Sequence, residues 1–431
     1  MADGAGEPKV RIDQVALAAT RPGGLSDRDL DHPQPGDTSD AYALRVGGWA
    51  IGDGQPVTGF ELAHQGIVLE TVPAIPSAED EHGARMELAV SSLELPYEFR
   101  VTARAVLKDR SRARVAILAG TRAAMPPGPA HGPVPVLVTT IGRSGSTAVT
   151  NLLCHHPDCT GYRPWDTETR MVSYWASVLR GLARPGSYER QLEQPLGPGF
   201  RYWWAGEPRH HNLPHDDPAL PALGREGVEG VVSFCRDQIG RMGTLLAQAA
   251  GKPAARFIVE KAQPEKARSV AEVVEELDPR TREIVLVRDL RDTVCSMRAY
   301  TEKTGVIGFG PRGDSSVEGS IRWLSNVSAK TLVDYIERRG AAAHLLRYED
   351  LIERPEATLT AVLDFIGASA SPAIVEQMLT RLAAERERRE AHATTGSAED
   401  SVGRWRREFS KAEQAVAEEV FGPQLEALGY R

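Results

Sequence analysis

The chain has 431 residues, 41% of them hydrophobic and 26% charged, so it is long enough for more than one domain and apolar enough to bury a core. Its formal net charge of −8 argues against a general nucleic-acid-binding surface, and basic character is expected only locally, in a pocket. No apolar run approaches the length of a membrane span, no leader pattern opens the sequence, and the four cysteines lack metal-ligand spacing, so we expect a cytoplasmic protein with reduced cysteines.

The first part of the chain contains short apolar segments separated by turn signals such as Gly52-Asp53-Gly54. Regular spacing of this kind predicts a small all-β sandwich over residues 1–122. Trp49 is expected to be a buried anchor of that sandwich, and a sugar-stacking aromatic is the alternative. The expected strands are Val10–Leu17, Tyr42–Ile51, Val57–Ala63, Ile67–Val72, Arg85–Ala89, Tyr97–Leu107 and Arg112–Leu118.

Residues 123–133 are rich in proline and glycine, which neither a helix nor a central strand tolerates, so we expect a linker there. Beyond it, strands alternate with helices, which predicts an α/β domain over 134–431 with a parallel sheet flanked by helices. The expected strands are Val134–Ile141, Arg256–Val259, Glu283–Val287 and Ala343–Arg347. The expected helices are Thr147–His156, Ala267–Leu277, Val317–Arg338, Glu356–Ile366, Pro372–Leu382 and a last one capped by Ser410 and Glu413 that breaks at Gly422-Pro423.

A Gly/Ser-rich loop joins the first strand of this domain directly to its first helix. Backbone N–H groups and the helix dipole favour an anion at such a junction, and Arg143 adds a fixed positive charge. The loop lacks the Gly-Lys-Ser/Thr ending with which ATP- and GTP-hydrolysing loops reach the outer phosphates and magnesium. An ordinary strand-to-helix turn is the alternative. The expected phosphate-binding residues are Gly142, Arg143, Ser144, Gly145, Ser146 and Thr147.

A second strand-to-helix junction carries a second candidate phosphate site. Arg288 follows the apolar strand Glu283–Val287, and Ser296 falls about two turns into the next helix. An arginine fork and a hydroxyl at this spacing are suited to binding a phosphate separate from the first.

Together these segments resemble the sulfotransferase superfamily, which uses 3′-phosphoadenosine 5′-phosphosulfate (PAPS) as donor and releases adenosine 3′,5′-bisphosphate (PAP). The resemblance implies a P-loop-type sheet in which the loop at 142–147 holds the 5′-phosphosulfate end, and Arg288 and Ser296 hold the 3′-phosphate. Leu290 stands where the family motif has proline. Three further segments resemble the family in the same order, Ile258–Pro264, Ala343–Leu351 and Val402–Trp405, and the last implies that Gly403, Arg404 and Trp405 cover the donor.

Sulfuryl transfer requires stabilisation of negative charge on the bridging oxygen of the donor. The resemblance implies that Lys261 lies at the sulfuryl group, where Arg143 and the loop amides add further positive charge and N–H donors. Because these groups surround the phosphosulfate, no metal is expected. For Lys261, an exposed lysine paired with Glu260 is the alternative.

The reaction also requires a base that removes the acceptor's proton. Cytosolic members of the family have a histidine where this chain has Gln263, which cannot act as a base. The carbohydrate-type and bacterial members use a glutamate after the first helix, so Glu168 is the first candidate and Asp166 the second. A helix-start acid favoured by the helix dipole is the alternative for both.

The acceptor is expected to be a carbohydrate, a glycolipid or a decorated natural product. Trp203, Trp204, His210 and His211 lie in an aromatic, proline-rich segment and are candidates for lining its pocket, with ordinary loop packing as the alternative. Two other functions stay open, a P-loop kinase or NTPase and a non-catalytic glycan-binding scaffold with a vestigial nucleotide site. The sequence does not indicate an oligomeric state.

Overall fold

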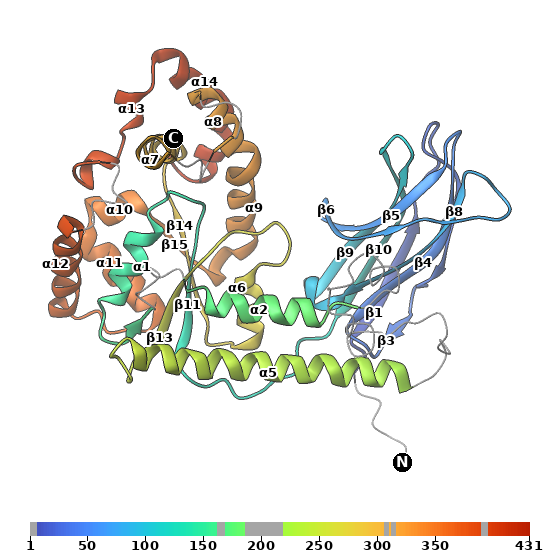
Figure 1. The fold of residues 1–431 in the computed structure, drawn as a ribbon, viewed down its shortest axis with the longest axis horizontal. Coiled ribbons are helices and arrows are strands. Elements are labelled where there is room, and N and C mark those ends of the chain that lie inside the picture. Colours follow the sequence, from blue (N-terminus) through green and yellow to red (C-terminus); the bar gives the residue numbers. More distant parts are fainter. Residues whose placement is uncertain (1–6, 162–168, 186–218, 306–309, 312–315, 389–394) are drawn as a thin grey trace. The chain divides into compact units, whose positions relative to one another are not determined.

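The structure, a computed structural model, describes residues 7–161, 169–185, 219–305, 310–311, 316–388 and 395–431 (Figure 1). The chain divides into two compact units. One unit holds Met1–Pro129 and Trp175–Arg236, and the other holds Ala130–Tyr174 and Asp237–Arg431. The sequence did not indicate that 175–236 would group with the N-terminal residues. The predicted domain limits and the linker at 123–133 stay predictions.

The N-terminal strands form two antiparallel sheets, which confirms the predicted all-β region. The six-stranded sheet has the order β3-β1-β10-β9-β5-β6, and the four-stranded sheet has the order β2-β4-β8-β7. The strands are β1 (Val10–Leu17), β2 (Leu25–His32), β3 (Thr38–Ser39), β4 (Ala43–Gly52), β5 (Val57–His64), β6 (Ile67–Pro73), β7 (Ile75–Pro76), β8 (Gly83–Ser91), β9 (Glu98–Leu107) and β10 (Arg112–Arg122).

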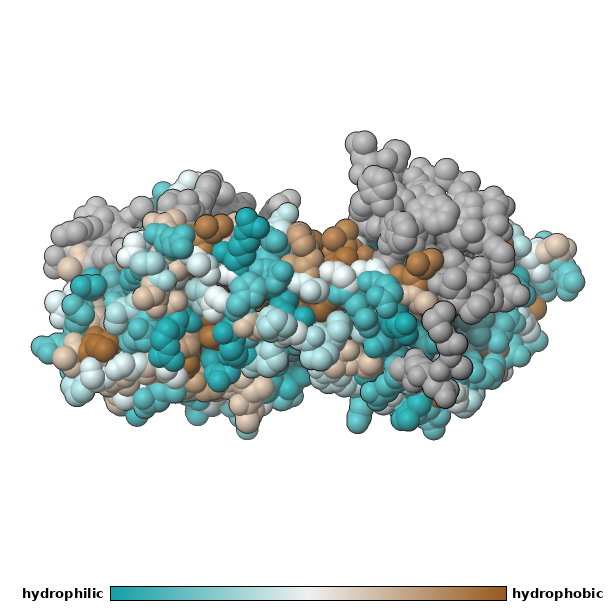
Figure 2. Space-filling model, turned by 90° about the horizontal axis from the view of Figure 1, so that it is seen from below, coloured by the Kyte–Doolittle hydropathy of each residue, from teal (hydrophilic) through white to brown (hydrophobic). Residues whose placement is uncertain are grey.

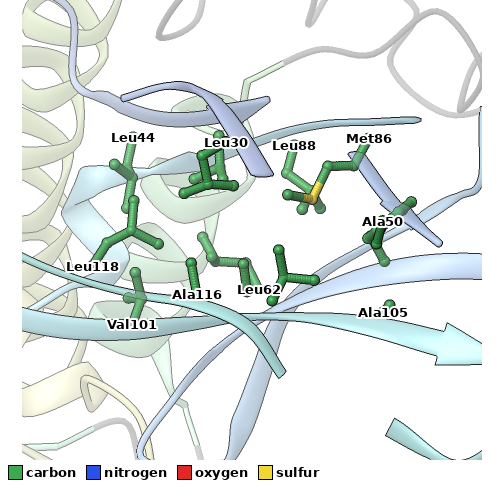
Figure 3. Close-up of a cluster of buried hydrophobic side chains, with 14 of the residues drawn as sticks. Leu30, Leu44, Ala50, Leu62, Met86, Leu88, Val101, Ala105, Ala116 and Leu118 are labelled. Carbon is green, nitrogen blue, oxygen red and sulfur yellow. The ribbon is translucent and has the colours of Figure 1, made fainter. Parts of the chain in front are cut away.

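The core of the sandwich lies between the two sheets (Figure 3). Leu44 of β4 faces Leu118 and Val101 from the other sheet, Ala50 of β4 faces Ala105, and all five are buried. Because side chains alternate along a strand, Trp49 points to the opposite face of β4. It is only half-buried there, so the expectation of a core anchor was wrong.

Two helices extend from one unit into the other, α2 (Met171–Leu182) and α5 (Ala219–Ala249). Within the first unit, Arg180 of α2 pairs with Glu94 at 3.3 Å, and Tyr42 donates to Glu229 of α5 at 3.1 Å. These contacts explain why 175–236 groups with the strands. On the face drawn in Figure 2, the residues coloured by hydropathy are mostly hydrophilic, with apolar ones singly or in small groups. No helix among the described residues is both long and apolar enough to span a bilayer.

The second unit is built on a parallel sheet of order β12-β13-β11-β14-β15, as predicted. Its strands are β11 (Val134–Thr139), β12 (Cys159–Thr160), β13 (Phe257–Ala262), β14 (Arg282–Val287) and β15 (His344–Arg347). Both faces are covered, because alternate residues of β14 enter different clusters: Ile284 and Leu286 pack with α1, α11 and α12, whereas Val285 and Val287 pack with α7, α8, α9 and α14 (Figure 1). The helices are α1 (Ser146–Cys154), α6 (Val270–Leu277), α7 (Leu290–Thr304), α8 (Val317–Leu324), α9 (Lys330–Arg339), α10 (Tyr348–Glu353), α11 (Pro355–Ile366), α12 (Pro372–Arg388), α13 (Trp405–Glu408) and α14 (Lys411–Ala427).

The last helix begins as predicted and ends later than predicted. Ser410 and Glu413 form the expected capping box at its start. The expected break at Gly422-Pro423 was wrong, since α14 continues to Ala427. Pro423 removes one N–H, but the carbonyl four residues earlier belongs to an exposed residue that water can reach. Phe421 and Leu425, both buried, hold the final turn against the core.

Candidate active site

The candidate site lies where β11, β13 and β14 end. The three strands are neighbours and run parallel, so their carboxyl ends meet at one edge of the sheet. In open α/β sheets ligands bind outside this edge. The loop after β11, Lys261 near the end of β13 and Arg288 after β14 therefore come to the same edge.

The loop after β11 turns sharply into the start of α1. Arg143 and Gly145 adopt left-handed backbone angles, with φ of 68° and 95°. Gly145 is required, because a Cβ there would lie 2.5 Å from a ring carbon of Tyr348. Gly145 is also the N-cap of α1 and gives no side-chain cap, so the first N–H groups of the helix stay available.

A buried hydroxyl in the same loop supports a ligand at this position. Ser144 is only 1% exposed, and its Oγ has no hydrogen-bond partner among the residues that the structure describes. Buried hydroxyls in folded proteins are nearly always paired. An anion on the loop would satisfy this donor.

Lys261 reaches the first turn of α1. Its Nζ donates to Thr147 Oγ1 at 2.8 Å, and the lysine is 8% exposed. The predicted Lys261 and Thr147 are thus brought together. A buried ammonium beside a helix N-terminus concentrates positive charge at this point.

Arg143, Arg288 and Ser296 form a second group. Arg143 Nε donates to Ser296 Oγ at 3.3 Å, and Arg288 Nη1 donates to the carbonyl of Arg143 at 3.3 Å. The guanidinium of Arg143 lies 4.5 Å from the ring centroid of Tyr300, and that of Arg288 lies 4.7 Å from the ring of Tyr348. Stacking of this kind holds each planar guanidinium in place.

The positive charges in this group lie close enough to affect one another. Burial lowers the pKa of Arg143 below its ordinary value, and the charges of Arg288 and Arg404 lower it further. Arg288 Nε is buried and has no hydrogen-bond partner within the described ranges. Like charges held together away from water favour a bound anion.

The late segment predicted to cover the donor lies against α7. Asp292 of α7 accepts hydrogen bonds from the backbone N–H groups of Gly403 at 2.6 Å and of Trp405 at 3.0 Å. Arg404 donates to Glu408 at 2.6 Å. The indole of Trp405 is buried, with the guanidinium of Arg291 4.0 Å from its ring centroid. The donor contacts assigned to Gly403, Arg404 and Trp405 stay predictions.

Six predicted residues lie outside the described residues. They are the two candidate bases, Glu168 and Asp166, and the four candidate acceptor residues, Trp203, Trp204, His210 and His211. Their roles stay predictions. Among the residues that are described, no group of three or more His, Cys, Asp or Glu side chains is arranged to hold a metal ion.

Sequence reasoning missed two side chains that shape the site, Asp292 and Tyr348. Tyr348 lies across Gly145, stacks on Arg288 and places its hydroxyl 3.1 Å from Ser401 Oγ. Both residues belong to segments that the family resemblance singles out, so the signal was present, but their partners are distant in sequence.

Glu260, which the sequence suggested only as an alternative partner of Lys261, is a buried carboxylate that fixes the start of α2. It accepts hydrogen bonds from the backbone N–H groups of Met171 at 2.7 Å and Val172 at 3.0 Å. Burial raises its pKa from 4.5 to about 7, although these hydrogen bonds act in the opposite direction. The glutamate next to Lys261 therefore positions the beginning of a helix.

Substitution of Glu260 by Gln is expected to change how stability depends on pH. A carboxyl whose pKa is raised by folding stabilises most below its unfolded pKa, and this contribution is lost as the pH rises through the folded value. Between pH 4.5 and about 7 the free energy of unfolding of wild type should fall by about 3 kcal/mol relative to that of the variant. Urea unfolding at pH 5, 6, 7 and 8 measures this difference. If the free energy of unfolding changes equally with pH in the two proteins, the prediction is wrong.

Comparison with known proteins gives one family match. The model of the sulfotransferase family matches residues 135–372, more than half of the chain, from β11 to the start of α12. The match contains the loop after β11, Lys261, Arg288 and Ser296, and ends before the 401–405 segment. No curated protein matches the chain.

Several solved structures are similar to the chain. Mouse sulfotransferase SULT7A1 complexed with PAP has 10% identity and a TM-score of 0.38, covering 68% of this chain and 84% of that one. The sulfotransferase domain from the curacin biosynthetic pathway has 16% identity and a TM-score of 0.35, covering 70% and 99%. Sulfotransferase STF9 from Mycobacterium avium has 13% identity and a TM-score of 0.34, covering 69% and 77%.

Proposed function

The chain belongs to the sulfotransferase family, and we propose that it transfers a sulfuryl group from PAPS to a hydroxyl or amine of a carbohydrate, glycolipid or natural-product acceptor. The observation that carries the choice of donor is the buried cationic site with two unpartnered donors, Ser144 Oγ and Arg288 Nε, among the described residues. These donors lie in two groups, which suits a ligand with two separate phosphate positions.

In this proposal the loop amides, Ser144 and Lys261 hold the 5′-phosphosulfate end of the donor. Arg288 and Ser296 hold the 3′-phosphate. Arg143 contacts both of these residues, so we move it to this group from the sulfuryl end, where the resemblance placed it. PAPS supplies the sulfuryl group, while the fixed cations and N–H groups stabilise charge on the oxygen that leaves it. No metal is required where such donors surround the phosphates. Glu168, or Asp166, is proposed to take the acceptor's proton.

Thermal unfolding with and without nucleotide tests the donor. PAP should raise the melting temperature, whereas ATP with magnesium should raise it much less, because a ligand that binds only the folded state stabilises it. Stabilisation by ATP with magnesium alone would support a kinase or NTPase instead. If PAP binds and no acceptor in a cell extract gains label from radioactive PAPS, the protein is a scaffold with a nucleotide site.

The same labelling experiment identifies the acceptor, since the labelled product carries the sulfated group.

We propose a cytoplasmic location, supported by four cysteines that are all free and buried.

Replacing Arg143 or Arg288 by Ala is expected to weaken PAP binding by about 2–4 kcal/mol, or roughly 30- to 1,000-fold. Each change leaves a buried phosphate without its charge-assisted hydrogen bonds. Titration calorimetry measures the affinities. Arg354→Ala is the control, because Arg354 is exposed and pairs only with Asp350 among the contacts that we describe. Unchanged affinity in both site variants would contradict the donor-site assignment.

A further inference from the structure

The 401–405 segment is attached to the candidate site by side chains of one short stretch, Arg288 to Asp292. Arg288 Nη2 donates to the carbonyl of Ser401 at 2.6 Å, while its Nη1 donates to the carbonyl of Arg143. One guanidinium thus joins the late segment to the loop after β11. A group bound at the remaining Nε of Arg288 would contact the residue that joins them.

Asp292 holds the far end of the same segment. It is 1% exposed, and its two carboxylate oxygens accept from different N–H groups, those of Gly403 and Trp405. Gly403 has a φ of 65°, so the chain turns sharply between the two bonds. Trp405 is the first residue of α13, so Asp292 also satisfies an N–H group that the helix leaves open.

Burying the carboxylate of Asp292 costs folding free energy unless hydrogen bonds compensate for its lost hydration. Asp292 lies in the first turn of α7, where the helix dipole favours an acid, but Asp289 already caps this helix by accepting from the N–H of Arg291 at 2.9 Å. The bonds of Asp292 go instead to a segment 111 and 113 residues away in sequence. Attachment of that segment is therefore its structural role.

We propose that Asp292 is a positioning residue that holds the 401–405 segment against the donor site and thereby slows donor release. This inference rests on the proposed function. Asp292 contacts backbone N–H groups and not the reacting atoms, so its loss should affect how long the donor stays bound far more than the chemical step. Arg288 couples attachment of the 401–405 segment to donor binding, because it contacts both this segment and the loop after β11.

The variant Asp292→Asn tests the proposal with little change of shape. Asn offers one acceptor oxygen and places an NH₂ group against the second N–H. We expect the KM for PAPS and the PAP dissociation rate to rise on the order of 10- to 100-fold, while kcat changes less than about threefold. Hydrogen exchange of the amides of Gly403 and Trp405 should accelerate by a similar factor, and PAP should slow this exchange in wild type.

Tyr348→Phe is a second variant, which removes only the hydroxyl that contacts Ser401. It should shift the same quantities in the same direction, by roughly three- to tenfold. It also keeps the test decisive if Asp292→Asn does not fold. The control is Asp350→Asn, a partly exposed acid on α10 that pairs with Arg354.

The outcomes separate this inference from the proposed function. If wild type does not bind PAP, the donor assignment fails. If wild type binds PAP but neither variant changes PAP release or amide exchange in 401–405, the role of Asp292 is overturned. A roughly hundredfold loss of turnover at unchanged KM would also overturn it, since that pattern indicates a catalytic contact.

Discussion

Replacing Lys261 by Met is expected to lower turnover by roughly 100- to 1,000-fold, while PAP affinity changes only a few-fold. The ammonium is buried at the edge of the sheet and lies 2.8 Å from Thr147 Oγ1 in the first turn of α1. A preorganised charge there stabilises the oxygen that loses the sulfuryl group, and removal of one such donor costs turnover on this scale. PAP lacks the sulfuryl group, so its binding reports on the phosphate contacts alone.

The measurement is a comparison of kcat for sulfate transfer with the dissociation constant for PAP. Lys266→Met is the control, because Lys266 is exposed five residues further along the chain and should leave both quantities unchanged. If the Lys261 variant keeps wild-type kcat, Lys261 does not act at the sulfuryl group. If it instead loses PAP binding with kcat unchanged, Lys261 contributes to binding only.

The strands that could be predicted are those whose apolar residues dominate the pattern. The predicted strand Val134–Ile141 corresponds to β11. The parallel sheet was predicted because strands of this kind alternate with helices along the chain. β2 was missed because only two of its residues, Leu25 and Leu30, enter the core, and the other six are all charged or polar. Its pairing with β4 through two register shifts is set by the neighbouring strand and not by its own pattern.

The long helix α5 was missed although its sequence carries a usable signal. Val228, Val232, Cys235 and Ile239 are all buried and recur at helical spacing. Several glycines in the same stretch lower its helix propensity and suggest a loop. Contacts with the rest of the protein outweigh that propensity, which is a weak local preference.

The candidate site was predictable where its residues follow strands that are neighbours in the sheet. Such strands bring Arg143, Arg288 and Lys261 to one edge without any knowledge of side-chain contacts. The sequence could not indicate which acid of the Arg288–Asp292 stretch caps α7 and which binds the 401–405 segment. That difference depends on where the late segment lies in space.

The second large effect is expected on replacing Glu168, the first candidate for the general base. Glu168→Gln should lower turnover by roughly 100- to 10,000-fold and leave PAP affinity unchanged. Gln keeps the shape and hydrogen bonding of the side chain but cannot accept the acceptor's proton. The reasons for choosing Glu168 are the acids in Trp165–Glu168, after the phosphate-loop helix, and Gln263 at the position of the histidine in cytosolic members. A pH profile of kcat should lose its acidic limb in the variant.

Asp166→Asn is the matched control, because only one of the two neighbouring acids can be the proton acceptor. A large loss in Asp166→Asn together with normal turnover in Glu168→Gln would exchange the two roles. If both variants turn over normally, the base lies elsewhere, and His210 and His211 are the next residues to replace. A loss of PAP binding in Glu168→Gln would instead indicate that this acid organises the donor site. A base that only removes the proton of the sulfated substrate should leave PAP affinity unchanged.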